Sequence, residues 1–293
     1  MMSLSIVIPA FNEAKSLEEF LPAVLKFSIV HNFELIIVND GSTDNTRLIL
    51  EELNDDNFIK VINNKQNLGY GAAIKAGILR ATSDFIITID ADGQHRLEDV
   101  LCLFNCIITN DADLVIGGRK GQKSVTRFRS LGKSIIRRFA KLYMDIPIYD
   151  INSGMKIYKS ALAKRYIRFA PDGMAFSDIM TIVFVNSKRL VIEEPIIIKQ
   201  RIAGESTISY QTAFQTIKEI TIIATTFFPL KFFGSLAALM FLISFGWGLP
   251  FLLQNKGFTT GTTLGLLFSS LFLVLGILAE LIALIRKDLI ENL

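Results

Sequence analysis

Cysteine is scarce in this sequence: of 293 residues only Cys102 and Cys106 are cysteines, four positions apart in a predicted helix. That spacing, which stacks both thiols on one helix face, fits a reduced compartment better than a disulfide framework, and we interpret both as small packed side chains. Internal repeats and low-complexity segments are absent as well, which excludes a repeat architecture. The net charge is only +3, so overall composition gives no argument for a nucleic-acid partner.

Charge is missing from two long runs near the C-terminus, residues 232–253 over 22 positions and residues 257–279 over 23. Each run is long enough to cross a hydrocarbon core of about 30 Å. The alternative is a pair of buried core helices, but such helices in soluble domains rarely exceed 20 residues without a charge. We therefore predict a two-helix transmembrane anchor over 232–293, with spans at about 232–253 and 262–285.

Basic residues flank these spans unevenly. Two precede the first span and two follow the second, while the connection 254–261 holds one: Lys218, Lys231, Arg286, Lys287 and Lys256. By the positive-inside rule, both ends of the chain are expected in the cytoplasm. Residues 4–9 read as a strand and not as a cleavable leader, so we expect an integral membrane protein whose soluble part is cytoplasmic.

An amphipathic helix is predicted at residues 210–231, between the soluble part and the first span. Its apolar stripe recurs every three or four residues and comprises Ala213, Ile217, Ile220, Ala224 and Phe227. We interpret it as a juxtamembrane helix in contact with membrane lipids, and an ordinary helix packed on the soluble domain is the alternative. Pro229 is expected to redirect the chain before the bilayer.

The soluble part, residues 1–209, alternates short β-rich runs with amphipathic segments. The runs are LSIVIPA (4–10), FELIIVND (33–40), FIKVINN (58–64), DFIITID (84–90) and DLVIGG (113–118). This rhythm is typical of an α/β fold with a doubly wound, mostly parallel sheet. Ligands of such sheets bind at the carboxyl ends of the strands.

Carboxylates follow one of these runs directly, as Asp90 and Asp92, with the amide of Gln94 two positions later. A hard divalent cation needs oxygen ligands of this kind, and a nucleoside diphosphate needs the cation to neutralise its charge. The motif predicts a site for Mg²⁺ or Mn²⁺. An ordinary turn that binds no metal also favours Asp and Gly, and the position of the motif at the end of a strand strengthens the metal-site prediction.

Two further strand ends carry polar residues, Asp40 after the run 33–40 and Glu13 after the run 4–10. Together the three ends predict a pocket for a base, a ribose and a diphosphate, although the segment 40–44 alone could be a turn and helix cap. The segment 67–71 (NLGYG) lacks the third glycine of a dinucleotide loop, because Ile74 stands there. We interpret it as a helix start beside the nucleotide.

These motifs, in order, resemble a known family: VIPAFNE, VNDGSTDNT, NLGYGAAIKAG, IDADGQH, DINSGMKIYK and RIAGEST. They look like the inverting family 2 glycosyltransferases of the GT-A fold, and most like the dolichol-phosphate mannose synthase and polyprenyl-phosphate glycosyltransferase branch. The resemblance covers residues 4–209, and this branch commonly carries a juxtamembrane helix and two C-terminal spans.

The resemblance implies roles for individual residues. Nucleotide contacts fall on Pro9, Phe11, Glu13, Asp40 and Asp90, metal and diphosphate contacts on Asp90, Asp92 and Gln94, and phosphate contacts on Arg201 and Ser206. The chain departs from the family pattern at Arg96-Leu97, where prolines often follow the histidine, and at Asp178, which fits the acidic acceptor-side motif only loosely.

A basic stretch without acids lies between Asp113 and Asp145. It holds nine cations: Arg119, Lys120, Lys123, Arg127, Arg129, Lys133, Arg137, Arg138 and Lys141. Four of them recur at four-residue spacing: Arg129, Lys133, Arg137 and Lys141. An apolar stripe lies on another side of the same predicted helix, so we expect one face to meet anions and the other to pack against apolar surface. With two spans nearby, we favour a lipid phosphate or anionic headgroups over nucleic acid, and a merely solvated face is the remaining alternative.

The predicted activity is inverting transfer of a sugar from a UDP-glucose or GDP-mannose type of nucleotide sugar to polyprenyl or dolichyl phosphate. Asp90, Asp92 and Arg201 are the candidate catalytic residues, with Arg129, Lys133, Arg201 and Ser206 on the acceptor phosphate. The phosphate is already ionised near neutral pH, so no strong base is required. If the acceptor is a sugar hydroxyl instead, Asp178 is the candidate base.

Two rival functions follow from the same features. A processive polysaccharide synthase usually carries a Gln-x-x-Arg-Trp motif and more spans, but the only tryptophan here is Trp247 in the first span. A non-catalytic membrane scaffold is the rival of another class, and the intact acidic motifs argue against it. Glu280, inside the last apolar run, is expected to meet a partner helix, the lipid phosphates or the surface beside Arg286. Two spans also suggest a homo-oligomer.

Overall fold

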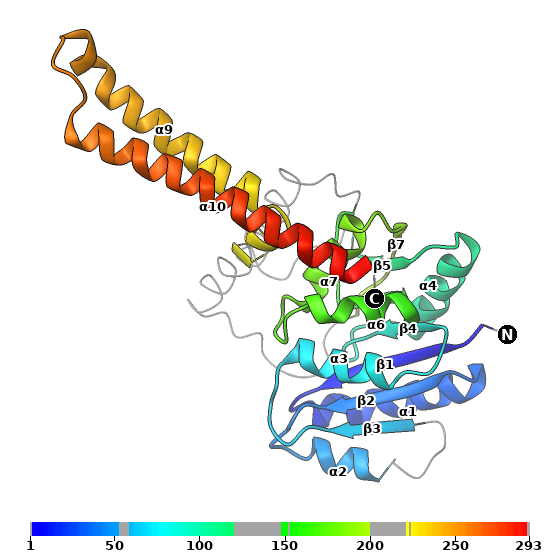
Figure 1. Cartoon of the computed structure of the whole chain (residues 1–293). Helices are drawn as coiled ribbons and strands as arrows, with labels where there is room; N and C mark the ends of the chain where they lie inside the picture. Colours follow the sequence, from blue (N-terminus) through cyan, green and yellow to red (C-terminus); the bar gives the residue numbers. More distant parts are fainter. Residues whose placement is uncertain are drawn as a thin grey trace. The chain divides into compact units, whose positions relative to one another are not determined.

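A computed structural model describes residues 2–52, 59–119, 148–151, 153–199, 221–222 and 224–291. The described residues form two compact units, one up to Lys199 and the other from Thr221 onward. Figure 1 labels the helices and strands of both units. The juxtamembrane helix predicted at 210–231 falls partly outside the described residues, and 221–222 and 224–227 are helical.

The first unit is built on a seven-stranded sheet in the order β3-β2-β1-β4-β6-β5-β7. Its strands are β1 (Leu4–Ala10), β2 (Glu34–Asn39), β3 (Ile59–Asn63), β4 (Phe85–Thr88), β5 (Leu114–Gly118), β6 (Lys156–Lys159) and β7 (Val191–Pro195). All run parallel except β6, which pairs antiparallel with both β4 and β5. The mostly parallel sheet predicted from the sequence is confirmed, and β6 and β7 were not predicted.

Helices cover both faces of this sheet. They are α1 (Ala14–His31), α2 (Thr46–Glu51), α3 (Tyr70–Arg80), α4 (Leu97–Thr109), α6 (Ser160–Tyr166) with a 3-10 turn (Ile167–Phe169), and α7 (Phe176–Asn186). Alternate residues of β1 show the two faces: Ile6 belongs to the core that α1 and α4 complete, whereas Val7 faces α3. Every β1 residue is buried, as expected of a central parallel strand.

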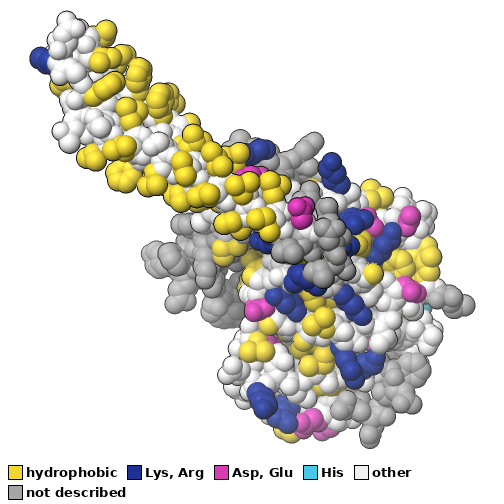
Figure 2. Space-filling view, viewed as in Figure 1, with side chains coloured by type: hydrophobic (Ala, Val, Ile, Leu, Met, Phe, Trp, Pro, Cys, Tyr) yellow, Lys and Arg dark blue, Asp and Glu magenta, His cyan; other side chains and the backbone are white. Residues whose placement is uncertain are grey.

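The second unit is an antiparallel hairpin of α9 (Pro229–Leu253) and α10 (Thr260–Glu291) (Figure 1). Both helices are long and apolar enough to cross a membrane, at Pro229–Leu253 and Thr260–Arg286. Small residues let them approach closely: Gly265 of α10 lies against Ser244 of α9, and Ser269 Oγ donates to the carbonyl of Ala237 at 2.8 Å. Large apolar side chains point outward instead and cover the visible face of the hairpin (Figure 2).

Two charged residues of α10 bind the start of α9. The backbone N–H of Leu230 donates to Glu280 Oε2 at 3.2 Å, and Arg286 Nη2 donates to the carbonyl of Thr226 at 2.8 Å. Pro229 is the first residue of α9 and has no N–H, so Leu230 carries one of the first free donors of the helix. Glu280 therefore caps the N-terminus of α9 within the same chain.

Candidate active site

The ends of β1 and β2 are joined by hydrogen bonds, as their parallel pairing requires. Asp40 N donates to the carbonyl of Ala10 at 2.8 Å, and Thr43 N donates to Asn12 Oδ1 at 2.8 Å. Asn12 has a φ of 55°, a left-handed conformation that Asn tolerates and that turns the chain into α1. The two predicted strand-end motifs are thus brought together at the carboxyl edge of the sheet.

Three of the predicted nucleotide residues lie on this edge. Pro9 is the buried penultimate residue of β1, Phe11 is 42% exposed, and Glu13 precedes α1. Glu13 N donates to Thr46 Oγ1 at 3.1 Å, and Ser16 Oγ donates to Glu13 Oε2 at 2.8 Å. The exposed ring of Phe11 is available to a ligand, and the contacts of Glu13 hold the edge in shape.

Asp40 is buried, with 2% exposure, and its carboxylate accepts three hydrogen bonds. Asn64 Nδ2 and the N–H of Leu68 donate to Oδ1 at 2.8 and 3.0 Å, and the N–H of Gly69 donates to Oδ2 at 2.8 Å. Asp40 therefore ties the loop 64–69, in front of α3, to the end of β2. Its direct contact with a nucleotide, implied by the resemblance, stays a prediction.

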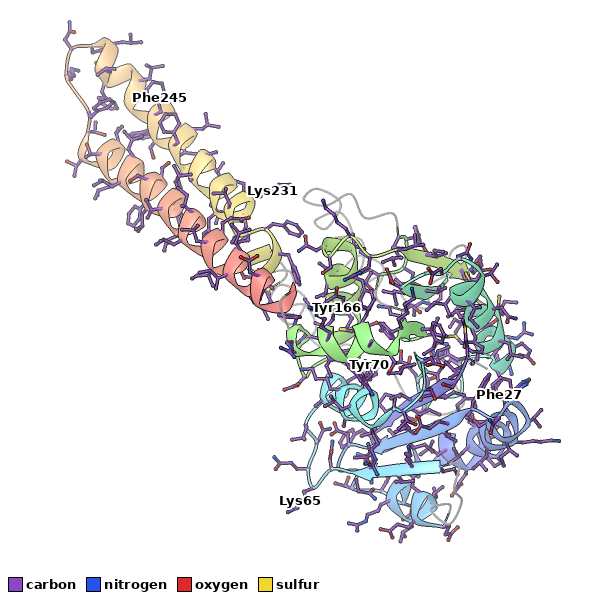
Figure 3. The ribbon with its side chains drawn as sticks, turned by 45° about the vertical axis from the view of Figure 1, so that its right-hand side comes forward. Phe27, Lys65, Tyr70, Tyr166, Lys231 and Phe245 are labelled. Carbon is purple, nitrogen blue, oxygen red and sulfur yellow. The ribbon has the colours of Figure 1, made fainter. Side chains whose placement is uncertain are left out.

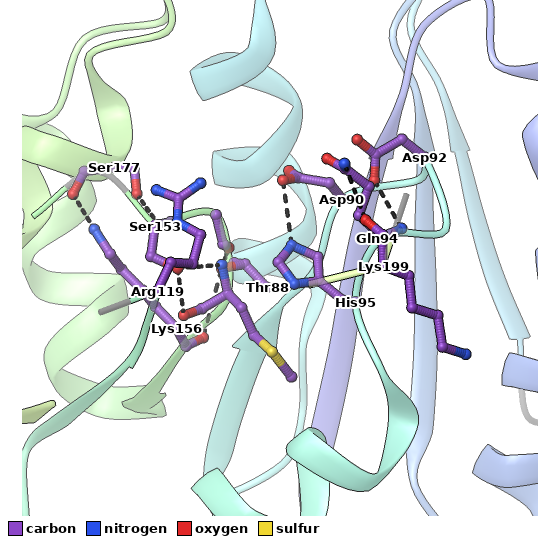
Figure 4. A network of polar contacts seen from close by, with 12 residues as sticks. Thr88, Asp90, Asp92, Gln94, His95, Arg119, Ser153, Lys156, Ser177 and Lys199 are labelled. Carbon is purple, nitrogen blue, oxygen red and sulfur yellow. Dashed lines mark hydrogen bonds and ion pairs between the residues drawn. The ribbon is translucent and has the colours of Figure 1, made fainter. Parts of the chain in front are cut away.

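Asp90 and Asp92 follow β4 at the same carboxyl edge (Figure 4). Ile89 N still donates to Val7 O at 3.1 Å, so the chain leaves the sheet at Asp90. Gln94 N donates to Asp92 Oδ1 at 3.1 Å, which closes a tight turn around Gly93 at φ 71°. Asp92 is thereby fixed in the turn that follows Asp90, and the metal contact of the two carboxylates stays a prediction.

Gln94 also joins this motif to the segment after β7. Its Nε2 donates to the carbonyl of Lys199 at 3.3 Å, and Lys199 N donates to the carbonyl of Gln94 at 2.9 Å (Figure 4). Lys199 lies two residues before Arg201 in the sequence. Lys199, the last described residue before the predicted phosphate-binding residues, is thus bound to Gln94 of the acidic motif.

The Asp90 carboxylate is 35% exposed and has a donor at each oxygen. The Tyr70 hydroxyl donates to Oδ1 at 2.9 Å, and His95 Nε2 lies 3.4 Å from Oδ2. Desolvation raises the pKa of Asp90, but the hydrogen bonds from His95 and Tyr70 and the positive charge of Arg119 outweigh it, so the pKa lies below its ordinary value. Asp90 is held as an anion.

Beyond Asp90, Arg119, Asp150 and Lys156 form a second group of charged side chains. Arg119 Nε and Nη2 donate to the two oxygens of Asp150 at 2.5 and 2.8 Å and form a bidentate ion pair. Asp150 is buried, with 6% exposure. Burial lowers the pKa of Arg119, but the hydrogen bonds and charge of Asp150 raise it by more, so the net pKa lies above its ordinary value and the guanidinium stays charged. The charge of Arg119 also acts on Asp90 and Asp178.

Lys156 is fully buried and joins β6 to α7. Its Nζ donates to the carbonyls of Ile151 and Ser177 at 2.7 and 2.5 Å and to Thr181 Oγ1 at 2.7 Å. Burial lowers the pKa of Lys156 to about 7, against the raising effect of Asp178 and Asp150. Asp178 itself is only 6% exposed, in the first turn of α7, within electrostatic reach of Arg119 and Lys156.

The site fits a divalent cation that brings its own oxygen ligands. Asp150 and Asp178 interact with the basic side chains of Arg119 and Lys156, whereas Asp90 and Asp92 both lie within electrostatic reach of Tyr70 and supply two further carboxylates. In the described part of the chain no group of three His, Cys, Asp or Glu side chains gathers as a metal cage. Mg²⁺ is commonly held by one or two carboxylates together with substrate phosphates, which matches Asp90 and Asp92.

Several predicted residues lie outside the described residues: Arg129, Lys133, Arg201 and Ser206. Sequence reasoning did not single out Tyr70, Asp150, Gly154 or Lys156, and it placed Arg119 only in a general basic set. Tyr70 and Asp150 stand in the quoted motifs NLGYG and DINSG, so the signal was their nearness to motif glycines and not any periodicity.

Several proteins with curated names align with most of this chain. Dodecaprenyl-phosphate galacturonate synthase of Rhizobium johnstonii is 28% identical over 96% of this chain and 88% of its own. Undecaprenyl-phosphate 4-deoxy-4-formamido-L-arabinose transferase of Proteus mirabilis is 27% identical over 97% and 90%. Dolichol-phosphate mannosyltransferase of Pyrococcus furiosus is 29% identical over 75% and 63%.

A solved structure shows the same fold. Glucosyl-3-phosphoglycerate synthase of Mycobacterium tuberculosis, crystallised with Mn²⁺, uridine diphosphate and phosphoglyceric acid, superposes with a TM-score of 0.57 at 17% identity over 76% of this chain and 78% of its own. Residues 228–285 match the GtrB C-terminal hairpin. Residues 5–167, more than half of the chain, match Glycosyl transferase family 2, and the protein belongs to that family.

Proposed function

We propose that this protein transfers a sugar from a nucleoside-diphosphate sugar to a polyprenyl phosphate at the surface of a membrane. The observation that carries the proposal is the pairing, in one chain, of the Asp90 and Asp92 edge with a hairpin of two helices long and apolar enough to span a bilayer. Relatives aligned over nearly the whole chain are named as synthases or transferases on dodecaprenyl and undecaprenyl phosphate.

On the donor side, the exposed ring of Phe11 and the edge formed by Pro9, Glu13 and Asp40 would hold the nucleoside. Asp90 and Asp92, with the amide of Gln94, would hold a Mg²⁺ or Mn²⁺ ion. That ion would neutralise the charge of the departing nucleoside diphosphate. Donors of the UDP-glucose or GDP-mannose type fit this arrangement.

On the acceptor side, a phosphate monoester is mostly ionised near neutral pH, since its second pKa is about 6. The acceptor oxygen is therefore already a nucleophile, and the site needs cations more than a base. Arg119, held by Asp150, is the described candidate, and Arg129, Lys133, Arg201 and Ser206 are the candidates outside the described residues. The burial of Asp178 beside Arg119 and Lys156 favours a positioning role over that of a base.

We infer a single in-line displacement at the anomeric carbon, which would invert the configuration of the sugar. The acceptor phosphate attacks from the side opposite to the diphosphate, which leaves with its bonding electrons. The basic residues around the spans favour a cytoplasmic site and cytoplasmic ends for the chain.

Purified full-length protein in detergent tests the proposal. It is incubated with polyprenyl phosphate and a panel of labelled nucleotide sugars, and the anomeric configuration of the lipid-linked product is determined. A lipid phosphate diester with inverted configuration supports the proposal. Transfer only to a sugar hydroxyl would favour a glycolipid or polysaccharide acceptor, and no transfer from any donor would favour a non-catalytic scaffold.

A further inference from the structure

The Tyr70 hydroxyl is bound to the first metal-motif carboxylate. Tyr70 is the first residue of α3, and its hydroxyl donates to Asp90 Oδ1 at 2.9 Å. A tyrosine hydroxyl has one proton to donate and a carboxylate oxygen only accepts, so Tyr70 is the donor in this contact. Tyr70 and a second tyrosine, Tyr166, are labelled in Figure 3.

The position of Tyr70 is set by the docking of the start of α3 on the segment 171–173. Ala72 N donates to the carbonyl of Asp172 at 3.0 Å, and Lys75 Nζ lies 2.7 Å from Asp172 Oδ1. Gly69 has a φ of 107°, and a Cβ there would lie 2.5 Å from the carbonyl oxygen of Asp172. The first turn of α3 therefore has little freedom to shift, and the hydroxyl is held where Asp90 needs it.

The Asp90 carboxylate is thereby constrained on three sides. Tyr70 donates to Oδ1, His95 Nε2 stands 3.4 Å from Oδ2, and Gly154 packs so closely that a Cβ there would lie 2.9 Å from Oδ1. A donor at each oxygen occupies one lone pair of each. Each oxygen keeps a second lone pair, but these contacts and the close packing of Gly154 hinder the carboxylate from turning to present both oxygens to one cation.

Divalent cations differ in whether they bind one or both oxygens of a carboxylate. Ca²⁺ binds at 2.3–2.6 Å and accepts both oxygens of a carboxylate, whereas Mg²⁺ requires near-octahedral geometry at 2.0–2.1 Å. Hydrogen bonds from surrounding residues orient metal-binding side chains, and their removal typically costs 10- to 100-fold in metal affinity. A carboxylate locked for one-oxygen binding favours the smaller ions.

We propose that Tyr70 is a positioning residue that locks the Asp90 carboxylate for one-oxygen binding and so selects small divalent cations such as Mg²⁺ and Mn²⁺ over Ca²⁺. The inference rests on the proposed function only in taking Asp90 to bind a divalent cation. It adds a residue, and a selectivity, that the acidic motif alone does not contain.

The test measures Mn²⁺ binding to the full-length protein in detergent by electron paramagnetic resonance, with UDP or GDP present and with Mg²⁺ or Ca²⁺ as competitor. Tyr70→Phe keeps the ring and removes the hydroxyl. Tyr166→Phe is the matched control, because the Tyr166 hydroxyl accepts a hydrogen bond from Arg189 Nε at 3.1 Å, beyond the far end of α7. Thermal unfolding of both variants verifies that they fold.

Tyr70→Phe is expected to raise the Mn²⁺ dissociation constant about tenfold and to make Ca²⁺ a relatively stronger competitor, while Tyr166→Phe binds as wild type does. Wild-type Mn²⁺ affinity in Tyr70→Phe, or an equal loss for Mn²⁺ and Ca²⁺, would overturn this inference alone. Absence of Mn²⁺ binding to the wild-type protein would overturn both this inference and the proposal that Asp90 and Asp92 hold a divalent cation.

Discussion

Gly154 lies directly beneath the Asp90 carboxylate, and its replacement by alanine tests how closely the site depends on that carboxylate. A Cβ at Gly154 would lie 2.9 Å from Cγ and Oδ1 of Asp90, and closer still to Oδ2. Ordinary contacts of a Cβ begin at 3.4 Å, so the carboxylate must move by about 1 Å. That shift would stretch the 2.9 Å hydrogen bond from Tyr70 past its useful range.

A displacement of about 1 Å in a catalytic group costs roughly 100-fold in rate, or about 2.7 kcal/mol of transition-state stabilisation. We therefore expect Gly154→Ala to lower the rate of sugar transfer about 100-fold in the detergent assay with polyprenyl phosphate. Gly173→Ala is the matched control, since a Cβ at Gly173 meets no atom within 4 Å. Near wild-type transfer by a folded Gly154→Ala protein would refute the reasoning.

Three further predictions concern stability, each measured by unfolding of the purified protein in detergent. Asp40→Ala removes the acceptor of three hydrogen bonds from the loop 64–69 and should destabilise by about 2 kcal/mol, and an unchanged unfolding free energy would contradict this. Burial lowers the pKa of Lys156 from 10.5 to about 7, so the unfolded chain binds more protons between these values. Wild-type stability should therefore gain from this group as the pH rises from 7 to 9, and Lys156→Met should lose that gain. Glu280→Leu removes the cap of α9 and should cost about 1 kcal/mol, with a smaller loss in Glu280→Gln, which keeps an acceptor oxygen; equal losses would count against capping.

The central part of the fold could be predicted because its signals are local. The apolar runs of β1, β2 and β4 are buried on both faces, which makes them stand out against the helices that separate them. The charge-free runs of α9 and α10 are equally plain. β6 was missed because it is short and starts with Lys156, a residue type that is seldom buried without partners.

The candidate site was predictable only where its residues adjoin strand ends. Asp90 and Asp92 follow β4 directly, so the topology rule for parallel sheets places them at the ligand edge. Tyr70 reaches Asp90 across 20 residues of sequence, and Arg119 reaches Asp150 across 31. No periodicity encodes such pairs, because the tertiary packing of α3 and of residues 148–151 creates them.

Glu280 illustrates the same limit in the hairpin. Its position in an apolar run marked it as unusual, but its partner, the N–H of Leu230, lies 50 residues away at the start of the other helix. The antiparallel hairpin brings the two together. A carboxylate in such a run therefore has a structural use within the chain.

The central claim is a divalent-cation-dependent transfer of sugar to a lipid phosphate through Asp90 and Asp92. It is tested most directly by measuring labelled lipid product from polyprenyl phosphate and a panel of nucleotide sugars, with Mg²⁺, with Mn²⁺ and with EDTA, for wild type and Asp92→Ala. The predicted result is a lipid-linked product in the wild type with Mg²⁺ or Mn²⁺, lost with EDTA and lost in Asp92→Ala. Product formation that persists in EDTA or in Asp92→Ala, or no lipid-linked product from any donor, would contradict it.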